Sequence, residues 1–408
     1  MRSFLNSKRS IIITILIVGL CFILTQCMDN GRKSHEISTE NLKFNQFAGS
    51  ITCAKCHKQI YDSFITTGHF STSEIANENS IKGSFQKGSN IFHYSPALYV
   101  AMEKSDSGLY QVEYSNGVRT IFRRFDITIG SGTRGQTYLS WDRDGSLNQL
   151  PISYLTSANG WANSPGDQNH VYFDRPINSR CLECHSTYAE IIPFRLQGSP
   201  EQFNKNEIFY GIGCEKCHGP GKMHVEFQTQ NPEAKIGKYI INPANFSRQQ
   251  SLDLCSLCHG GRIKSIKPTF TFQSGNRLKD DFIVDTINNG SIDVHGNQYG
   301  LLAKSKCFQL SGMTCLSCHS PHDDERRNLA LYSQRCMTCH NSQHSEICKM
   351  TGKIANISSN CIDCHMPEQT SKSIVLQLQN RNIPTAQLLR THFITVYPDA
   401  TKKFLSKQ

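Results

Sequence analysis

The sequence predicts an irregular fold of mainly short helices and loops wrapped around bound groups, with a small antiparallel β insertion. Three observations predict it. The motif Cys-x-x-Cys-His occurs seven times in 408 residues. Six of these motifs crowd into residues 179–370, where their histidines follow one another at intervals of 33, 41, 60, 21 and 25 residues. The long gap between the first and second motifs is rich in β-branched and aromatic residues, as strands are.

The seven motifs contain fourteen of the eighteen cysteines, and we number them 1 to 7 in chain order. They comprise Cys53, Cys56 and His57; Cys181, Cys184 and His185; Cys214, Cys217 and His218; Cys255, Cys258 and His259; Cys315, Cys318 and His319; Cys336, Cys339 and His340; and Cys361, Cys364 and His365.

The spacing within each motif has a chemical reason. Two cysteines three positions apart lie on one turn of chain, so both sulfurs can form thioethers to one porphyrin, and the adjacent histidine can ligate its iron. Zinc or redox cysteines are the alternative, but zinc ribbons need pairs of Cys-x-x-Cys and no fixed histidine. Seven motifs, each followed by histidine, therefore predict seven haem c groups with the motif histidines as proximal ligands.

The first residues predict export, which covalent haem attachment requires. Arg2, Lys8 and Arg9 precede an apolar run over 11–24, which fits a signal peptide and is shorter than the roughly 20 residues of a membrane span. The run ends at Cys27 in a sequence that resembles a bacterial lipoprotein box, although Gln26 stands where a small residue is usual. We expect a lipid on Cys27 that anchors the protein to a membrane. Ordinary cleavage nearby and an uncleaved anchor are the alternatives.

The chain divides into six predicted regions. These are a signal peptide of the lipoprotein type (1–27), a polar tether (28–48), a first haem segment (49–72), a β-rich insertion (73–178), a six-haem region (179–370) and a C-terminal tail (371–408) that supplies a distal histidine. Strands are expected at 91–94, 98–102, 110–114, 118–129 and 136–141, with hairpin turns at 115–117 and 143–145, and one more strand at 374–378.

Nine histidines lie outside the motifs and are candidates for the opposite, distal face of the haems. His35 falls in the tether and is expected to be exposed, which leaves eight for seven distal positions. His322 and His344 follow a motif histidine by only three and four residues. Because the two axial ligands occupy opposite faces of a flat ring, each of these two is expected to ligate a different haem. His224, six residues after His218, is similarly placed.

Several segments resemble a known family. CAKCHKQIYDSFITTGH, CHGPGKMH, CHSPH, CHMP and RTHFITVYP are similar to bacterial multihaem cytochromes with cytochrome c-552/4-type domains and to the tetrahaem cytochrome c of ammonia oxidisers. The resemblance covers nearly all of the chain from residue 49. It implies His69, His224, His322 and His392 as the best distal ligands, followed by His170, His295 and His344; His93 has no clear counterpart.

The charge excludes a nucleic-acid function. The formal net charge is +10, and removal of residues 1–27 takes away Arg2, Lys8 and Arg9 and no acid, which leaves +7. Each ferric haem adds about −1, because its two propionates outweigh the iron–porphyrin core, so seven haems bring the total near zero.

The predicted function is electron transfer through seven mostly bis-histidine haems in a bacterial respiratory chain, with redox proteins as partners. The alternative is an oxidoreductase with one open haem that acts on nitrite, hydroxylamine or sulfite, and Arg123, Arg124 and Lys216 are candidates to attract such an anion. Catalytic residues and oligomeric state are left open. The protein is expected in the periplasm or as a lipoprotein of a bacterial envelope. Cys307 and Cys348 lie outside the motifs and either pair as a disulfide or stay two buried thiols.

Overall fold

The computed structural model describes residues 42–166, 170–193, 198–284, 292–341, 348, 350, 357–379 and 384–406. The signal peptide, Cys27, the part of the tether before residue 42, His35 and His344 lie outside these ranges, so the expectations for them stay predictions. The described residues form one compact unit that begins at Leu42.

The first haem segment contains short helices. They are η1 (Phe44–Gln46), α2 (Ser50–Cys53), α3 (Lys58–Phe64) and η2 (Phe70–Thr72). His57 occupies the N-cap position of α3, so the histidine of motif 1 lies where one helix ends and the next begins.

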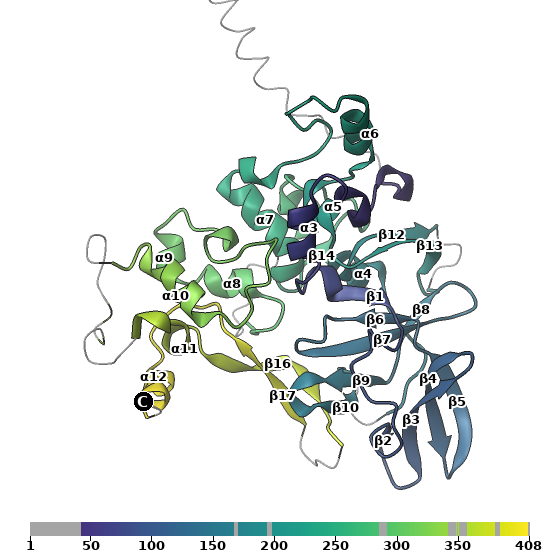
Figure 1. Ribbon diagram of the computed structural model, residues 1–408. Coiled ribbons are helices and arrows are strands. Elements are labelled where there is room, and N and C mark those ends of the chain that lie inside the picture. Colours follow the sequence, from purple (N-terminus) through teal and green to yellow (C-terminus); the bar gives the residue numbers. More distant parts are fainter. Residues whose placement is uncertain are drawn as a thin grey trace, which may run out of the picture. The chain divides into compact units, whose positions relative to one another are not determined.

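Two antiparallel sheets follow (Figure 1). One contains β1 (Ser73–Ile75), β6 (Ile127–Ile129), β7 (Gly135–Trp141), β8 (Leu147–Gln149), β9 (Ile152–Leu155), β10 (Gly160–Asn163) and β11 (Arg175–Pro176), with η3 (Thr156–Ala158) between β9 and β10. The other contains β2 (Ile91–His93), β3 (Leu98–Ser105), β4 (Gly108–Ser115) and β5 (Val118–Arg124). We call residues 73–176 the β module.

The strands expected in this stretch are present, with one difference. The run over 118–129 is not continuous, because the chain leaves the smaller sheet after Arg124 and enters the larger one at Ile127. The turn at 115–117 has Asn116 and Gly117 at φ values of 49° and 77°, the left-handed conformation that a two-residue hairpin requires.

Aromatic side chains fill the core of the β module. Phe125 meets Tyr138 edge to face at 4.8 Å between ring centroids, and the indole Nε1 of Trp161 donates to the Ser84 carbonyl at 2.9 Å. Burial of each such large side chain contributes about 1.5–3 kcal/mol, so this module has its own stable core without a bound group.

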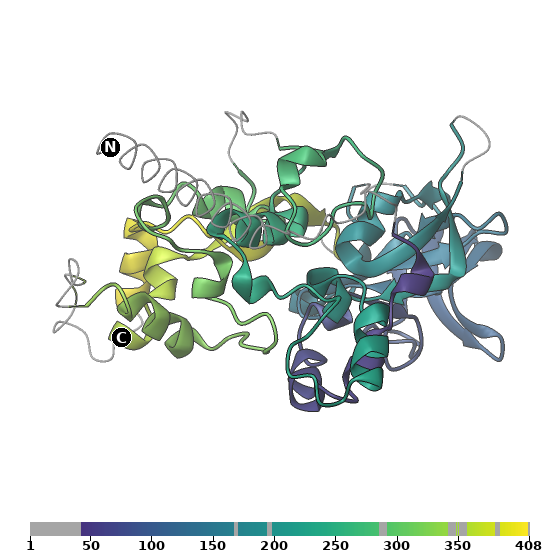
Figure 2. The ribbon, with the colours of Figure 1, turned by 90° about the horizontal axis from the view of Figure 1, so that it is seen from above.

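Helices and paired strands alternate over the remaining six motifs (Figure 2). The helices are α4 (Ser179–His185), α5 (Cys214–His218), α6 (Lys222–Gln230), η4 (Pro243–Asn245), α7 (Arg248–His259), η5 (Leu278–Asp280), α8 (Gln298–Leu302), α9 (Lys306–Gln309), η6 (Cys315–Ser317), α10 (Leu329–Met337), η7 (Ile357–Ser359), α11 (Ile362–His365) and α12 (Pro398–Leu405). The strands pair as β12 (Ser186–Ile192) with β13 (Gln202–Tyr210), β14 (Lys264–Ser265) with β15 (Phe282–Ile283), and β16 (Glu368–Leu376) with β17 (Thr385–Arg390).

The predicted fold class is therefore wrong in its proportions. Within the described ranges, strands form sheets of seven and four members and three further pairs, so the sheet is a major component and not a small insertion. The physical reason is that side chains of β12 and β13 build an apolar core themselves: Tyr188, Phe203 and Ile208 are buried together with Leu182 of α4. The connection between two closely spaced motifs can therefore form paired strands.

The β16–β17 hairpin connects the β module with the motif region. The Asn163 backbone N–H donates to the Gln377 carbonyl at 3.2 Å, and the His93 N–H donates to the Gln379 Oε1 at 2.7 Å. His392 follows two residues after β17. None of the described helices is long and apolar enough to cross a lipid bilayer.

Candidate haem centre

Each motif forms a helical turn. Where the motif lies outside a longer helix, the histidine N–H still bonds the carbonyl of the first cysteine, as from His57 to Cys53 at 2.9 Å and from His319 to Cys315 at 3.0 Å. Residues three apart lie on one face of such a turn. Both thiols of a motif are therefore available on the same side, as two thioethers to one porphyrin require.

Two motif histidines have Nδ1 bonded to a backbone carbonyl. His218 Nδ1 lies 2.9 Å from the Ile241 oxygen, and His365 Nδ1 lies 3.0 Å from the Thr395 oxygen. A carbonyl can only accept, so Nδ1 carries the proton and Nε2 keeps its lone pair. This tautomer is the one in which Nε2 ligates a metal, and the hydrogen bond fixes the orientation of the ring.

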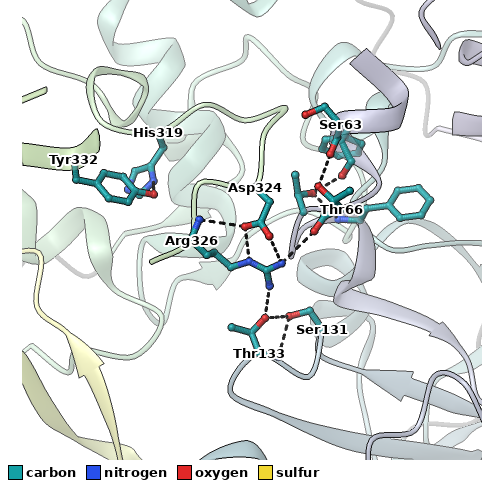
Figure 3. Close-up of polar contacts among 11 residues, drawn as sticks. Ser63, Thr66, Ser131, Thr133, His319, Asp324, Arg326 and Tyr332 are labelled. Carbon is teal, nitrogen blue, oxygen red and sulfur yellow. Dashed lines mark hydrogen bonds and ion pairs between the residues drawn. The ribbon is translucent and has the colours of Figure 1, made fainter. Parts of the chain in front are cut away.

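Three more motif histidines have a polar side chain at Nδ1. His259 Nδ1 lies 3.2 Å from Gln298 Oε1, and His185 Nδ1 lies 3.2 Å from Thr72 Oγ1. His319 Nδ1 lies 3.3 Å from the Tyr332 hydroxyl. Figure 3 draws these two side chains next to each other. In all five cases the second ring nitrogen is left for the iron.

Three pairs of imidazoles lie at a separation that suits an iron between them. The ring centroids of His69 and His259 are 6.1 Å apart, those of His218 and His322 are 6.1 Å apart, and those of His319 and His392 are 6.3 Å apart. Imidazole–metal bonds are about 2.0 Å long, so two rings that ligate one metal from opposite sides have centroids about 6 Å apart. The residues therefore fit a haem iron held between two histidines.

These pairs join distant parts of the chain. His69 faces motif 4, His322 faces motif 3 and His392 faces motif 5. The placement of His322 agrees with the expectation that it reaches a haem other than that of motif 5. Iron ligation by all three distal candidates remains a prediction.

Burial keeps the His69 and His392 imidazoles neutral. Removal from water, with a smaller effect of neighbouring histidines, lowers the pKa of His69 to about 4 and that of His392 to about 4. Both rings are therefore unprotonated at neutral pH, which is the form that binds a metal.

Two further candidates lie beside motif histidines. The ring of His295 interacts electrostatically with His185 and His259, so His295 is placed near motif 2. His224 lies near His218, and its Nδ1 is 2.9 Å from the Lys238 carbonyl, which leaves its Nε2 for a metal.

His170 and His93 lie in or beside the strands of the β module. The His170 ring packs on Tyr172 at 5.7 Å between centroids and lines a small hollow with Gln149 and Arg175. The exposed His93 ring lies 5.2 Å from that of Tyr99. The contacts described for both involve residues of the β module and the hairpin, and distal ligation by His170 remains a prediction.

Cysteines of different motifs contact each other. The thiols interact in four pairs, Cys53 with Cys214, Cys184 with Cys258, Cys255 with Cys315 and Cys336 with Cys361. Motif 3 is therefore a neighbour of motif 1, motif 4 of motifs 2 and 5, and motif 6 of motif 7. Spatial order differs from chain order, which the sequence did not reveal.

A polar network positions the loop that carries His322 (Figure 3). Arg326 bonds Asp324, donates to the Thr66 carbonyl at 3.1 Å and bonds the Thr133 hydroxyl. The Ser63 hydroxyl donates to Asp323. The loop is thereby tied to the end of α3 and to the β6–β7 turn.

Glu215 of motif 3 connects that motif with the first haem segment. Its buried carboxylate accepts the N–H groups of Ala48 at 2.7 Å, Gly49 at 2.8 Å and Gly221 at 2.7 Å. Glu215 was not predictable from the sequence, because haem attachment places no constraint on the two middle residues of a Cys-x-x-Cys-His motif.

Substitution of Glu215 by alanine is expected to lower the free energy of unfolding by about 3 kcal/mol, because buried N–H groups lose a charged acceptor. The denaturation midpoint of the haem-loaded protein measures this. Glu226→Ala, on the exposed side of α6, is the matched control and is expected to change little. Equal losses in the two variants would contradict the role given to Glu215.

The remaining candidates are the two cysteines outside the motifs and three basic residues. Cys307 and Cys348 are both free thiols here, and Cys307 lies near Cys339 whereas Cys348 lies near Cys364. Arg123 and Arg124 lie on β5 and pair with Asp142 and Asp126. Lys216 lies over the Phe270 ring at 4.9 Å.

Similar proteins support the assignment of the motifs as haem sites. A family profile described as cytochrome c554 and c-prime matches residues 160–219. Two C-type polyheme cytochromes of Geobacter sulfurreducens are similar: OmcC at 20% identity over 52% of this chain and 23% of its own length, and OmcB at 22% over 46% and 20%. The chain thus spans only about a quarter or less of these relatives.

The fold is also found in a solved structure. The outer cell wall cytochrome OcwA superposes with a TM-score of 0.52 at 16% identity, over 88% of this chain and 81% of that one. The profile match includes motifs 2 and 3, and the superposition extends the likeness in fold to the β module and the other motifs. On its motifs, its paired imidazoles and these relatives, the chain belongs to the multihaem c-type cytochromes.

Proposed function

We propose that the protein is an electron carrier of a bacterial respiratory chain, with one haem c at each of its seven motifs and most irons between two histidines. The observation that carries this proposal is the set of three facing imidazole pairs, at 6.1–6.3 Å between centroids. A metal between two imidazoles has both axial positions filled, which leaves no position for a substrate and favours electron transfer.

Haem, when bound, supplies an iron that gains and loses single electrons. The chain provides the anchors, the axial ligands and the hydrogen bonds that tune them. Carbonyl acceptors on His218 and His365 increase electron density on the imidazole, which favours oxidised iron and lowers the reduction potential. His319 has the Tyr332 hydroxyl beside Nδ1 instead of a carbonyl, so we expect its site to differ in potential from those of His218 and His365.

The thiol contacts between motifs support transfer along an array. Motif 4 touches motifs 2 and 5, and motif 1 touches motif 3. Neighbouring anchor points are what single-electron transfer from site to site requires, and motif 4 is the branch point of the described contacts.

The test combines haem content with electron paramagnetic resonance of the oxidised protein. We expect seven haems per chain and low-spin ferric signals for them. A high-spin signal that accounts for about one haem would indicate an iron with an open position. It would overturn the carrier function and call for assays with substrates.

An oxidoreductase with one open haem is the second candidate function. Nitrite, hydroxylamine and sulfite are the substrates to assay if the high-spin signal appears.

Export, a lipid on Cys27 and redox proteins as partners complete the proposal. The basic start and the apolar run support export, and the sequence that ends at Cys27 supports the lipid. Incorporation of labelled palmitate into the full chain, and its loss in Cys27→Ser, is the expected result; label retained in the variant would contradict the anchor.

A further inference from the structure

The Asp293 carboxylate lies between the loop that carries His295 and the start of the C-terminal hairpin. Oδ1 accepts the backbone N–H of His295 at 2.7 Å and the Ser371 hydroxyl at 2.9 Å. Oδ2 accepts the N–H groups of Lys372 and, at 3.1 Å, of Ser373. One side chain thus holds together two segments almost eighty residues apart.

Four donors on one ionised carboxylate make a strong junction, because hydrogen bonds to a charged acceptor are about twice as strong as neutral ones.

His295 depends on this junction for its position. Its backbone N–H donates to Asp293, and its ring interacts electrostatically with His185 of motif 2 and His259 of motif 4. The other side of the junction, residues 371–373, belongs to β16, which begins three residues after His365. β16 pairs with β17 at residues 368–370 and 375–376, and Gln377 accepts the Asn163 N–H of the β module. Residues 371–373 lie in the irregular stretch between these paired parts, where Asp293 accepts their hydrogen bonds.

We propose that Asp293 is a positioning residue that holds His295 at the iron of motif 2. The proposal rests on the proposed function, in which His295 is a distal ligand. Loss of the carboxylate frees the His295 loop from β16, so the imidazole leaves the axial position while the cysteines of motif 2 keep the haem attached.

The experiment is Asp293→Ala in the full-length, haem-loaded protein, read by electron paramagnetic resonance and optical spectra. We expect about one haem in seven to become high-spin and to return to low-spin when free imidazole is added. Refilling by imidazole distinguishes a vacated axial position from general unfolding. Asp293→Asn keeps one acceptor oxygen and is expected to give a smaller high-spin fraction, which provides a second reading if the alanine variant does not mature.

Asp144→Ala is the matched control. Asp144 accepts the Ser146 N–H at 2.8 Å and the Ser146 hydroxyl at 2.7 Å in the β7–β8 turn, and is expected to leave the spectra unchanged. His295→Ala tests iron ligation by His295 separately from the positioning role of Asp293. If His295→Ala is high-spin and Asp293→Ala is fully low-spin, the positioning role is overturned alone. If His295→Ala is itself fully low-spin, the ligand assignment is overturned and the positioning role with it.

Discussion

Replacement of His69 by alanine is expected to convert about one haem in seven from low-spin to high-spin ferric iron. His69 faces His259 at 6.1 Å between ring centroids, and burial keeps its imidazole neutral at pH values above about 4. Removal of the side chain leaves the iron of motif 4 with one axial ligand, which also raises its reduction potential because an electron-donating imidazole is lost.

The His69→Ala substitution is expected to affect motifs 2 and 5 as well as motif 4. Thiol contacts join motif 4 to motifs 2 and 5, so a changed potential at motif 4 alters the connection between them. Spectra of the oxidised variant and a potentiometric titration measure both consequences, and added imidazole is expected to restore the low-spin signal.

His93→Ala is the control for this variant. His93 is exposed on β2 with its ring against Tyr99, so its removal is expected to leave the spin state of every haem unchanged. A fully low-spin His69→Ala protein, or the same high-spin fraction in both variants, would contradict the pairing of His69 with motif 4.

The parts of the centre that were predictable are local in sequence. A Cys-x-x-Cys-His motif determines its own helical turn, and the His57 N–H bonds the Cys53 carbonyl as a turn requires. The spacing of His322 and His319 already made a shared iron unfavourable on steric grounds. Which motif His322 faces was not predictable, because His218 lies 104 residues away and only tertiary packing brings the two together.

The errors have identifiable causes. The spacing of motifs 2 and 3 predicted helices and loops between them, whereas β12 and β13 bury Tyr188, Phe203 and Ile208 in an apolar core. Apolar burial between these side chains decides the local structure, so the strands form between two haem sites.

The residues that position the ligands were missed for another reason. Arg326 stands in the charged run Asp323-Asp324-Glu325-Arg326-Arg327, which resembles a solvated surface loop. Asp293 precedes His295 by two residues, a spacing at which aspartate can bond a backbone N–H, but the spacing says nothing about β16. Contacts between distant segments give these residues their roles.

Glu183 of motif 2 is expected to be among the most important single residues for stability. Its side chain is 1% exposed and accepts from Arg180 Nη1 at 2.6 Å and from the Phe270 N–H at 2.7 Å. Arg180 also bonds the Leu257 carbonyl, close to motif 4, and lies over the Phe282 ring at 4.9 Å. The pair thus joins α4 to α7 and to the segment before β15.

Glu183→Ala is expected to lower the free energy of unfolding by about 3–5 kcal/mol, because it leaves the Arg180 charge largely buried without a partner. Chemical denaturation followed by circular dichroism, at equal haem content, measures the loss. Asp62→Ala removes the partner of Lys58 in an exposed pair and is expected to cost no more than about 0.5 kcal/mol.

A double variant tests the reason for the loss. Replacement of Arg180 by methionine together with Glu183 by leucine removes both charges and keeps apolar volume, and such replacements are often neutral. We therefore expect the double variant to recover much of the stability that Glu183→Ala loses. If the double variant is as unstable as Glu183→Ala, the unpaired charge is not the cause, and the hydrogen bonds to Phe270 and Leu257 stabilise this junction instead.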